Sequence, residues 1–492
     1  MKQLRNHILL LQLLWICEVG YAQQIRFRDV LGNTGYDYGM SAQQTFNHGY
    51  IVCGSTTSVG NGNTDIYVIE TDSVGKPVNE CSIGGFNIEQ GACIRQTADS
   101  GYVLVGYSNH NNYKGYDIYV AKLDTKLHVQ WEKTYGGTDW EFGRSIQQTT
   151  DGGYIICGGT YSYGKGDEDY YLIKTNNLGD TLWTRTYGGS EKDEAKSVFQ
   201  TADGGYIITG STMGTDSLGD FYTIKTNATG DILWTNAFAT PELDLANDVI
   251  QLSSGSYAVV GETKGGGSGK SDGVIIEISS SGITGNVIHF GGSDDDNLVA
   301  VAERIDHKIL FTGLTKSYGF TNGKGDLYFG MLNSDWSYNM STTFGSNGKE
   351  TVNSVAGTND KGAIICGTTN GFRNFLEDIY LIKTDSMGYS APKETVLVTR
   401  IAENEQAQGL NMEMYPNPST EMVYLTPSLT YPCFASITVY DPAGRLLKQQ
   451  DVRLLPNTTV PITTSELSNG IYFIRITTDH LTVSKRLVVK HE

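Results

Sequence analysis

A carboxylate returns at a nearly fixed interval through most of this chain, and the interval defines a repeat unit. Consecutive members of the series are separated by steps of 52, 52, 52, 51, 52 and 54 residues: Asp37, Glu89, Glu141, Asp193, Asp244, Asp296 and Glu350. Two further series keep the same interval, namely the glycines Gly54, Gly106, Gly158, Gly210, Gly261, Gly313 and Gly367 and the aspartates Asp65, Asp117, Asp169, Asp220, Asp272, Asp326 and Asp378. Three series in register through seven units indicate a repeat architecture rather than one irregular globule.

Each unit predicts four short antiparallel strands, which we name a to d. Segments such as YIITGST (206–212) and DFYTIKTN (220–227) are rich in Ile, Thr and aromatic residues and are bounded by Gly, Asp and Asn. They lack the 3.6-residue periodicity of helical repeats. Four-stranded units of this length, repeated radially, form the blades of a β-propeller. The sequence therefore predicts an all-β protein with a seven-bladed β-propeller followed by a small C-terminal β-sandwich.

The last unit runs out near Gly388 without an obvious strand d. A matching segment stands at the other end of the chain, at residues 25–32, where Phe27 occupies the slot that Trp131, Trp183 and Trp234 fill in other units. We therefore expect the N-terminal strand to complete the last blade and close the ring.

The first residues predict export. Basic residues Lys2 and Arg5, an apolar run from Ile8 to Cys17 and small residues before Ala22 form a secretory signal, residues 1–22, which is too short to span a membrane as a mature helix. We expect an exported, soluble protein, monomeric and without a transmembrane segment.

The formal charge of -18 belongs to the repeat region, because residues 413–492 hold seven basic and seven acidic residues. Such a surface disfavours nucleic acid and anionic lipid as partners. Cys53, Cys157 and Cys366 share one repeat slot, which predicts buried thiols, while Cys81 and Cys93 could pair.

The repeats resemble those of secreted bacterial β-propellers with the pattern D-x-Y-x-x-K-x-(D/N)-x-x-G, which reads here from Asp169 through Lys174 and Asn176 to Gly179. The flanking Y-G-G and D-G-G-Y elements stand at 187–189 and 203–206. The resemblance implies a β-propeller over residues 23–392.

The C-terminal segment resembles the sorting domain of the type IX secretion system of Bacteroidetes. The resemblance rests on strand and turn motifs that include Pro416, Asn417, Pro418, Gly444, Gly470, Lys485 and Arg486. It implies recognition by the type IX secretion machinery, export across the outer membrane, and release or anchoring at the cell surface. The predicted organisation is a signal peptide (1–22), a propeller (23–392), a linker (393–412) and a sorting domain (413–492).

The b–c loops vary in length and content between units, and variable loops on a regular scaffold commonly carry binding specificity. Their aromatic residues are candidate ligand contacts for a glycan or a protein: Tyr107, Tyr113, Tyr161, Tyr163, Tyr318 and Phe320. The alternative is that these residues only shape the loops.

Acidic residues raise the possibility of Ca²⁺. Asp294, Asp295 and Asp296 resemble part of a calcium loop. The seven strand-a carboxylates should ring one mouth of the central channel, where they either hold a cation or accept backbone N–H bonds in turns.

No catalytic residues can be assigned, because local spacing assembles neither a Ser-His-Asp nor a His-x-x-x-His group. The sequence therefore favours a binding or scaffold module. One alternative is a polysaccharide lyase or glycosidase with paired carboxylates near the channel mouth; another is a calcium-stabilised structural ring.

Overall fold

The computed structural model describes residues 25–60, 63–109, 115–213, 218–319, 324–346, 348–372, 376–390, 411–428, 433–441, 446–454, 459–478 and 482–491. The chain divides into two compact units between residues 397 and 398. All regular elements among the described residues are β-strands. The predicted signal peptide and most of the predicted linker lie outside the described residues.

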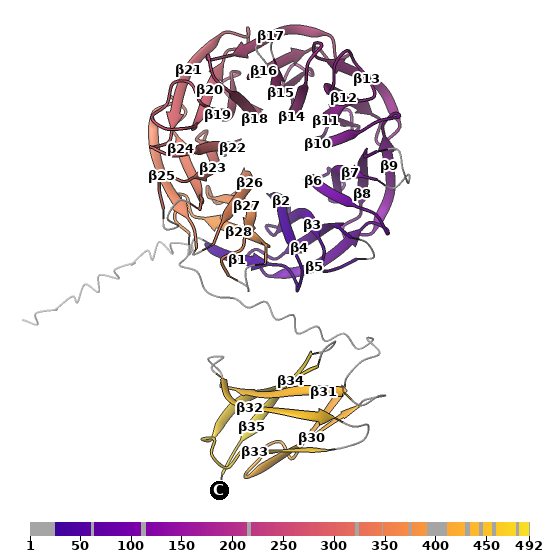
Figure 1. Ribbon diagram of the computed structural model, residues 1–492, viewed down its shortest axis with the longest axis vertical. Coiled ribbons are helices and arrows are strands. Elements are labelled where there is room, and N and C mark those ends of the chain that lie inside the picture. Colours follow the sequence, from indigo (N-terminus) through magenta and orange to yellow (C-terminus); the bar gives the residue numbers. More distant parts are fainter. Residues whose placement is uncertain are drawn as a thin grey trace, which may run out of the picture. The chain divides into compact units, whose positions relative to one another are not determined.

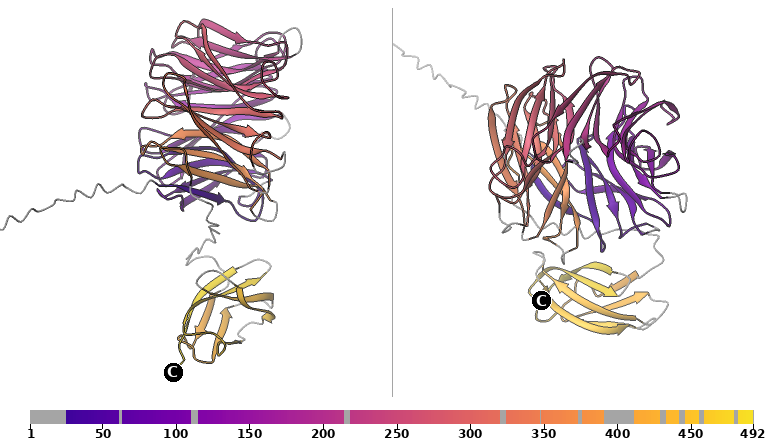
Figure 2. Two further views of the ribbon diagram at one scale, coloured as in Figure 1. Left: turned by 90° about the vertical axis from the view of Figure 1, so that its left-hand side faces the viewer. Right: turned by 45° about the horizontal axis from the view of Figure 1, so that its top comes forward.

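The first unit is a seven-bladed β-propeller, as the sequence predicts. Figure 1 shows seven four-stranded antiparallel sheets around one axis, with strand a innermost and strand d outermost. Seen from the side in Figure 2, the strands run between the two faces of the propeller. Blades 1 to 3 comprise β2 (Asp37–Gln44), β3 (Tyr50–Thr56), β4 (Asp65–Thr71) and β5 (Pro77–Ile83); β6 (Glu89–Gln96), β7 (Tyr102–Ser108), β8 (Asp117–Leu123) and β9 (Val129–Tyr135); and β10 (Glu141–Gln148), β11 (Tyr154–Thr160), β12 (Asp169–Thr175) and β13 (Thr181–Tyr187).

Blades 4 to 6 continue in the same order. They comprise β14 (Asp193–Gln200), β15 (Tyr206–Met213), β16 (Gly219–Thr226) and β17 (Ile232–Phe238); β18 (Asp244–Gln251), β19 (Tyr257–Thr263), β20 (Asp272–Ile278) and β21 (Thr284–Phe290); and β22 (Asp296–Glu303), β23 (Ile309–Thr315), β24 (Asp326–Leu332) and β25 (Tyr338–Phe344).

The seventh blade is built from both ends of the propeller. It combines β26 (Glu350–Gly357), β27 (Ala363–Thr369) and β28 (Asp378–Thr384) with the N-terminal β1 (Phe27–Leu31). Strand β1 pairs antiparallel with β28, placing Phe27 opposite Lys383 and Leu31 opposite Ile379. The predicted closure by the N-terminal strand is confirmed.

Every inner strand carries a β-bulge at its fourth residue. The pairing of β10 with β11 passes from Gly143 to Ser145, so Arg144 is the extra residue, and the other six blades shift at the same place. A bulge bends its strand and re-aims the extra side chain. The glycine series in strand b follows from a close approach to strand a. A Cβ would lie 1.7–2.0 Å from the carbonyl oxygen of the second strand-a residue if it were added at Gly54, Gly106, Gly158, Gly210, Gly261, Gly313 or Gly367.

Neighbouring blades meet where strand d of one blade covers the c–d turn of the next. At five interfaces a large strand-d residue lies against a turn glycine: Phe27 on Gly75, Trp131 on Gly179, Trp183 on Gly230, Trp234 on Gly282 and Met340 on Gly388. At the other two, the strand-d slot holds Asn79 or Asn286 and the turn holds Leu127 or Trp336. Both large turn residues are buried at positive φ, 62° and 66°. Their burial outweighs the cost of a left-handed backbone.

Four blades bury a lysine of strand c. The Nζ atoms of Lys122, Lys174, Lys225 and Lys383 lie 2.9 Å from carboxylate oxygens of the a–b turns. At one of these turns burial works to raise the pKa of Asp203, but hydrogen bonds from Thr201, Lys225 and the Gly205 N–H outweigh it and hold the pKa at about 2. The ion pair therefore fixes the turn to strand c at neutral pH.

The second unit is a small β-sandwich. Its two sheets have the orders β29-β30-β33 and β32-β31-β34-β35. Side chains from both sheets, including Val423, Ile437, Ile474 and Leu487, form one buried core. The strands are β29 (Asn411–Tyr415), β30 (Met422–Ser428), β31 (Cys433–Tyr440), β32 (Leu446–Leu454), β33 (Val460–Thr463), β34 (Gly470–Thr478) and β35 (Thr482–Val489).

Cys53, Cys157 and Cys366 are buried, as expected from their repeat slot. Cys81 and Cys93 are both free, because one stands on the outer strand β5 and the other on the inner strand β6 of the next blade. The suggested pairing is therefore wrong.

Candidate ligand-binding face

The seven strand-a carboxylates begin the inner strands, and all are buried. Six accept a hydrogen bond of 2.6–3.1 Å from a backbone N–H of the d–a turn, at Asn33, Gly85, Gly137, Gly189, Thr240 and Gly292. The seventh, Glu350, accepts from the Ser346 hydroxyl. This is the turn-capping arrangement, one of the two roles that the sequence leaves open.

The strand-c aspartates face the same turns. A Cβ added at Gly188 would lie 2.1 Å from Oδ1 of Asp169 and 2.5 Å from Oδ2 of Asp193. Burial, together with the nearby charge of Asp169, raises the pKa of Asp193. The first glycine of the Y-G-G element is thus required by the close approach of two carboxylates.

The three consecutive aspartates of blade 6 serve three different partners. Oδ1 of Asp294 lies 2.9 Å from Nζ of Lys270, and Oδ2 of Asp295 lies 2.9 Å from Nζ of Lys316. Asp296 is the buried capping carboxylate of its blade. In the described part of the chain, no three His, Cys, Asp or Glu side chains converge as a metal-binding group. Calcium binding here stays a prediction.

Five aromatic side chains gather where blades 2 and 3 meet, and we call them the aromatic patch: Tyr107, Tyr116, Trp140, Phe142 and Tyr161. The ring centroid of Phe142 lies 5.1 Å from that of Tyr107, 6.1 Å from Trp140 and 6.5 Å from Tyr161. Trp140 is 48% exposed and so offers the patch to solvent. The structure therefore brings together two residues that the sequence singles out, Tyr107 and Tyr161. Tyr107 stands within strand β7, opposite Ile118, and not in the b–c loop where the sequence analysis places it, because the strand extends to Ser108.

Sequence reasoning misses the other three members of the patch. Trp140 and Phe142 flank the capping carboxylate Glu141, and Tyr116 precedes Asp117 at the start of strand c. Trp140 and Phe142 hold repeat positions outside the variable b–c loops, whereas Tyr116 is the last residue of the loop between β7 and β8. The position alone gives no clear signal, because the first unit also carries aromatic residues there, Tyr36 and Tyr38, whereas Gln90, Glu194 and Asn297 replace Phe142 in three others.

Tyr163 and Tyr318 have a different environment. Their hydroxyls donate to the carbonyl oxygens of Gly136 and Gly291, at 3.0 and 2.7 Å, and so brace the d–a turns. Tyr163 also packs on Tyr171, with 5.5 Å between ring centroids. Tyr318 stands on blade 6, outside the aromatic patch of blades 2 and 3. The predicted contacts Tyr113 and Phe320 lie outside the described residues.

Five charged side chains adjoin the patch, and we call them the charged cluster: Arg144, Glu168, Lys192, Glu194 and Lys196. Oε1 of Glu194 accepts from Nη2 of Arg144 at 3.0 Å and also binds Lys196. Nζ of Lys192 lies 3.1 Å from Oε2 of Glu168, which also accepts from the Tyr161 hydroxyl at 3.0 Å. The guanidinium carbon of Arg144 lies 5.6 Å from the ring centroid of Phe142. Patch and cluster therefore form one continuous surface.

The charges in this cluster perturb one another. Burial works to raise the pKa of Glu194, but the charges of Lys196 and Arg144 outweigh it and lower the pKa. Burial and then the Arg144 charge lower the pKa of Lys196 despite its carboxylate partner. Burial opposes the charge of Lys192, yet Glu168 and Glu194 raise its pKa. Three cations thus share two carboxylates in a partly desolvated setting.

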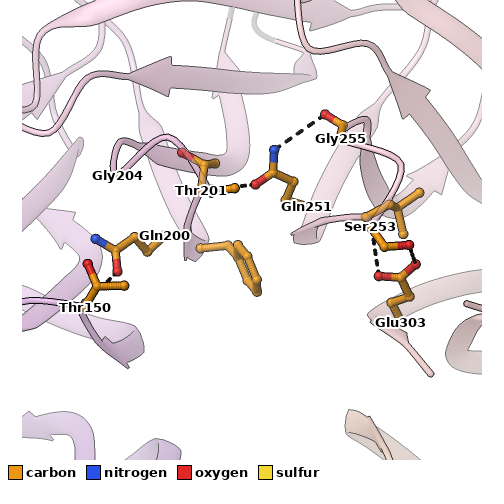
Figure 3. A pocket seen from close by; sticks show the side chains of 11 residues that line it. Thr150, Gln200, Thr201, Gly204, Gln251, Ser253, Gly255 and Glu303 are labelled. Carbon is orange, nitrogen blue, oxygen red and sulfur yellow. Dashed lines mark hydrogen bonds between the residues drawn. The ribbon is translucent and has the colours of Figure 1, made fainter. Parts of the chain in front are cut away.

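A hollow of about 440 Å³ lies at the opposite end of the inner strands. Figure 3 shows that it is bordered by side chains that link adjacent blades. Oε1 of Gln200 accepts from the N–H of Thr150, and Oε1 of Gln251 from that of Ala202. The same interblade bond recurs at Gln96, Gln148, Glu303 and Gln44. The polar side chains that border the hollow therefore hold neighbouring blades together.

One serine, one histidine and one carboxylate do meet beside this hollow. Oγ of Ser253 lies 2.6 Å from Oε1 of Glu303 and 2.8 Å from Nδ1 of His307. The same Nδ1 lies 3.5 Å from Glu303. A catalytic triad uses one imidazole nitrogen for the serine and the other for the acid. Because Nδ1 faces both partners here, the three residues lack triad geometry.

The predicted sorting motif is anchored to the last strand of the second unit. The side chain of Asn417, between Pro416 and Pro418, donates to the carbonyl of Arg486 at 2.9 Å and accepts from the N–H of Val488 at 2.8 Å. Gly470 begins β34, and Lys485 and Arg486 stand exposed on β35. Gly444 lies outside the described residues.

Comparison with known proteins identifies the second unit. Residues 413–490 match the family model of the secretion system C-terminal sorting domain. The protein is therefore secreted by the type IX route and directed to the cell surface, and its sorting domain interacts with the secretion machinery. No helix of membrane-spanning length and apolarity occurs among the described residues.

One curated protein and three solved structures resemble this chain at low sequence identity. Regulatory protein FlaEY of Caulobacter vibrioides is 24% identical over 176 residues, which are 30% of this chain and 18% of that protein. A puromycin hydrolase mutant structure has a TM-score of 0.47 at 10% identity, covering 80% of this chain and 58% of the other. The propeller domain of the Trilobed protease from Pyrococcus furiosus has a TM-score of 0.43 at 10% identity, covering 75% of this chain and 100% of the other. Polysaccharide lyase Uly1 has a TM-score of 0.41 at 12% identity, covering 74% of this chain and 93% of the other. Such likenesses carry no argument about activity.

Proposed function

Because the sorting domain exports this protein, we propose that its propeller is an extracellular binding module that holds a glycan on the aromatic patch. The carrying observation is the half-exposed Trp140 among four further aromatic rings. Aromatic rings present large apolar faces that stay well ordered at low entropic cost, which suits the C–H faces of sugars. A protein ligand would use the same surface and is the other outcome of the test.

Placement on the scaffold supports this proposal. The patch lies at an interface between two blades, where Phe142 is held by four neighbouring rings. Oε1 of Gln90 accepts from the hydroxyl of Tyr107, and Glu168 accepts from that of Tyr161. Residues locked by packing and hydrogen bonds form a preorganised surface, so little ordering entropy opposes binding.

The test is a glycan array with the full secreted chain, followed by affinity measurement for each hit. Trp140→Ala should weaken binding about tenfold or more, as expected for a central aromatic contact. Tyr318→Ala is the matched control, because Tyr318 is 50% exposed on the same face but stands on blade 6. Equal losses in both variants, or none in Trp140→Ala, would contradict the assignment to blades 2 and 3. Running each array with calcium and with chelator also tests the cation prediction.

Lyase chemistry on an acidic polysaccharide is the second candidate. The strand-a carboxylates, which the sequence suggests as paired catalytic groups, are buried and bonded to their turns. They are therefore poorly placed to meet a substrate. The observation in its favour is Lys196, whose pKa is lowered by burial and by Arg144. A lysine of lowered pKa can act as a base. Ultraviolet absorbance of an unsaturated product during incubation with uronate polysaccharides would reveal turnover, and Lys196→Met should abolish it.

A further inference from the structure

The charged cluster differs in the sign of its charge from the rest of the repeat region. The chain carries a formal charge of -18, and its negative excess lies in the repeat region. Yet beside the aromatic patch three basic side chains, Arg144, Lys192 and Lys196, form their ion pairs with two carboxylates, Glu168 and Glu194. A local positive excess in an acidic surface attracts anions selectively, because the surrounding field repels them elsewhere.

The inner-strand bulge places the two central cations. Arg144 and Lys196 are the extra residues of the bulges in blades 3 and 4, the residues that strand pairing skips. The corresponding residues in the other blades are neutral: Met40, Ala92, Asn247, Val299 and Asn353. The positive site therefore belongs to blades 3 and 4 alone and is not a general property of the fold.

The hydrogen bond to Glu194 leaves other N–H donors of the Arg144 guanidinium available to a ligand. In the described residues Glu194 is the hydrogen-bond partner of the Arg144 guanidinium, through Nη2 at 3.0 Å. A guanidinium carries five N–H donors in a planar fork that matches a carboxylate bidentately. Arg144 is about one-third exposed and its guanidinium lies over the Phe142 ring. One ligand can therefore stack on the aromatic patch and present an anionic group to the fork.

We propose that the glycan bound at this face contains uronic acid, and that Arg144 with Lys192 and Lys196 binds its carboxylate. This inference rests on the proposed function and adds the charge class of the ligand. The aromatic patch supplies stacking on the sugar ring, and the charged cluster discriminates acidic sugars from neutral ones.

The experiment compares one sugar with and without its charge. Binding of oligogalacturonate and of its methyl ester to the full chain is measured by titration calorimetry at low and high salt. The acid should bind at least about tenfold more tightly than the ester at low salt, and salt should narrow the difference. A sulfated galactan oligosaccharide forms the third arm; binding of sulfate esters in preference to carboxylates overturns the carboxylate assignment.

Two arginine variants supply matched controls. Arg144→Gln should weaken binding of the acid about tenfold or more and leave the ester unchanged. Arg185→Gln removes an equivalent arginine, 39% exposed, that pairs with Asp231 and lies over Trp183 on the outer strand of blade 3. It should change neither ligand. An Arg144→Gln effect equal for acid and ester, or absent for both, overturns the inference.

Failure here is distinguishable from failure of the proposed function. If acid and ester bind equally and both require Trp140, the aromatic site stands and the charge preference is wrong. If no glycan binds the folded protein, or if Trp140→Ala changes nothing, the proposed function is wrong and the uronate assignment with it. Tryptophan fluorescence of each variant checks folding.

Discussion

The N-terminal strand should be a principal source of propeller stability, and Leu31→Ala measures its contribution. Leu31 is 1% exposed and lies in β1 opposite Ile379 of β28. Truncating a buried leucine to alanine costs about 2–5 kcal/mol, from lost burial and from the cavity left behind. The free energy of unfolding of a typical domain is about 5–15 kcal/mol. Leu31→Ala should therefore remove a large fraction of it.

A matched control separates closure from leucine loss in general. Leu233, in the outer strand β17, is 57% exposed, so Leu233→Ala should cost within about 0.5 kcal/mol. Urea titration followed by tryptophan fluorescence reports the propeller alone, because residues 413–492 contain no tryptophan. The midpoint should fall clearly for Leu31→Ala and barely for Leu233→Ala, with similar slopes.

If Leu31→Ala lowers the unfolding free energy by no more than Leu233→Ala does, then β1 does not hold the seventh blade in solution. Closure would then have to come from the interface between blades 7 and 1. That interface includes the hydrogen bond from the Asn353 side chain to the Gly39 carbonyl, 2.7 Å long.

Three further outcomes are expected. The pKa of Asp203 is about 2 in the folded protein against an ordinary 3.8, so its contribution to the free energy of unfolding is present above about pH 4 and is lost as the pH falls toward 2. Asp203→Asn should therefore reduce the change of the urea midpoint with pH between about 4 and 2. Burial, and then the charge of Asp151, raises the pKa of Tyr206 to about 12 from 10.0, so its contribution is complete below about pH 10 and is lost as the pH rises toward 12. Tyr206→Phe should therefore move alkaline unfolding, followed by circular dichroism, to higher pH. Leu127→Gly should destabilise by about 1–2 kcal/mol in thermal melts, because the lost burial exceeds the relief of its left-handed backbone.

Repetition made the fold predictable, because each copy repeats the same physical constraint. The strand-b glycine recurs because the carbonyl oxygen of the second strand-a residue leaves no room for a Cβ, and a large residue recurs in one slot of strand d because it covers the next blade. Phe27 in that slot was sufficient to predict closure by the N-terminal strand, which the pairing of β1 with β28 confirms.

The candidate site was only partly predictable, because function departs from the repeat. Tyr107 and Tyr161 stood out in variable loops, but Phe142 and Arg144 occupy ordinary positions of strand a. Their importance depends on which blades adjoin and on where the bulge turns the fourth side chain. The prediction that Cys81 and Cys93 pair was wrong for a similar reason. Residues that are close in sequence can stand on the outer strand of one blade and the inner strand of the next.

The blade interfaces are of two kinds that cannot be exchanged: five place a large strand-d residue on a turn glycine, and two place a strand-d asparagine beside a large turn residue. Seven similar units in one chain invite misassembly, in which a blade pairs with the wrong neighbour and another is left out of the ring. Trp183 against the turn that carries Leu127 would clash, whereas Asn286 against the turn that carries Gly230 would leave a void. Either error costs on the order of 1–3 kcal/mol per interface. The two asparagine interfaces thereby reject neighbours that the five glycine interfaces accept, which removes some of the wrong pairings open to similar blades.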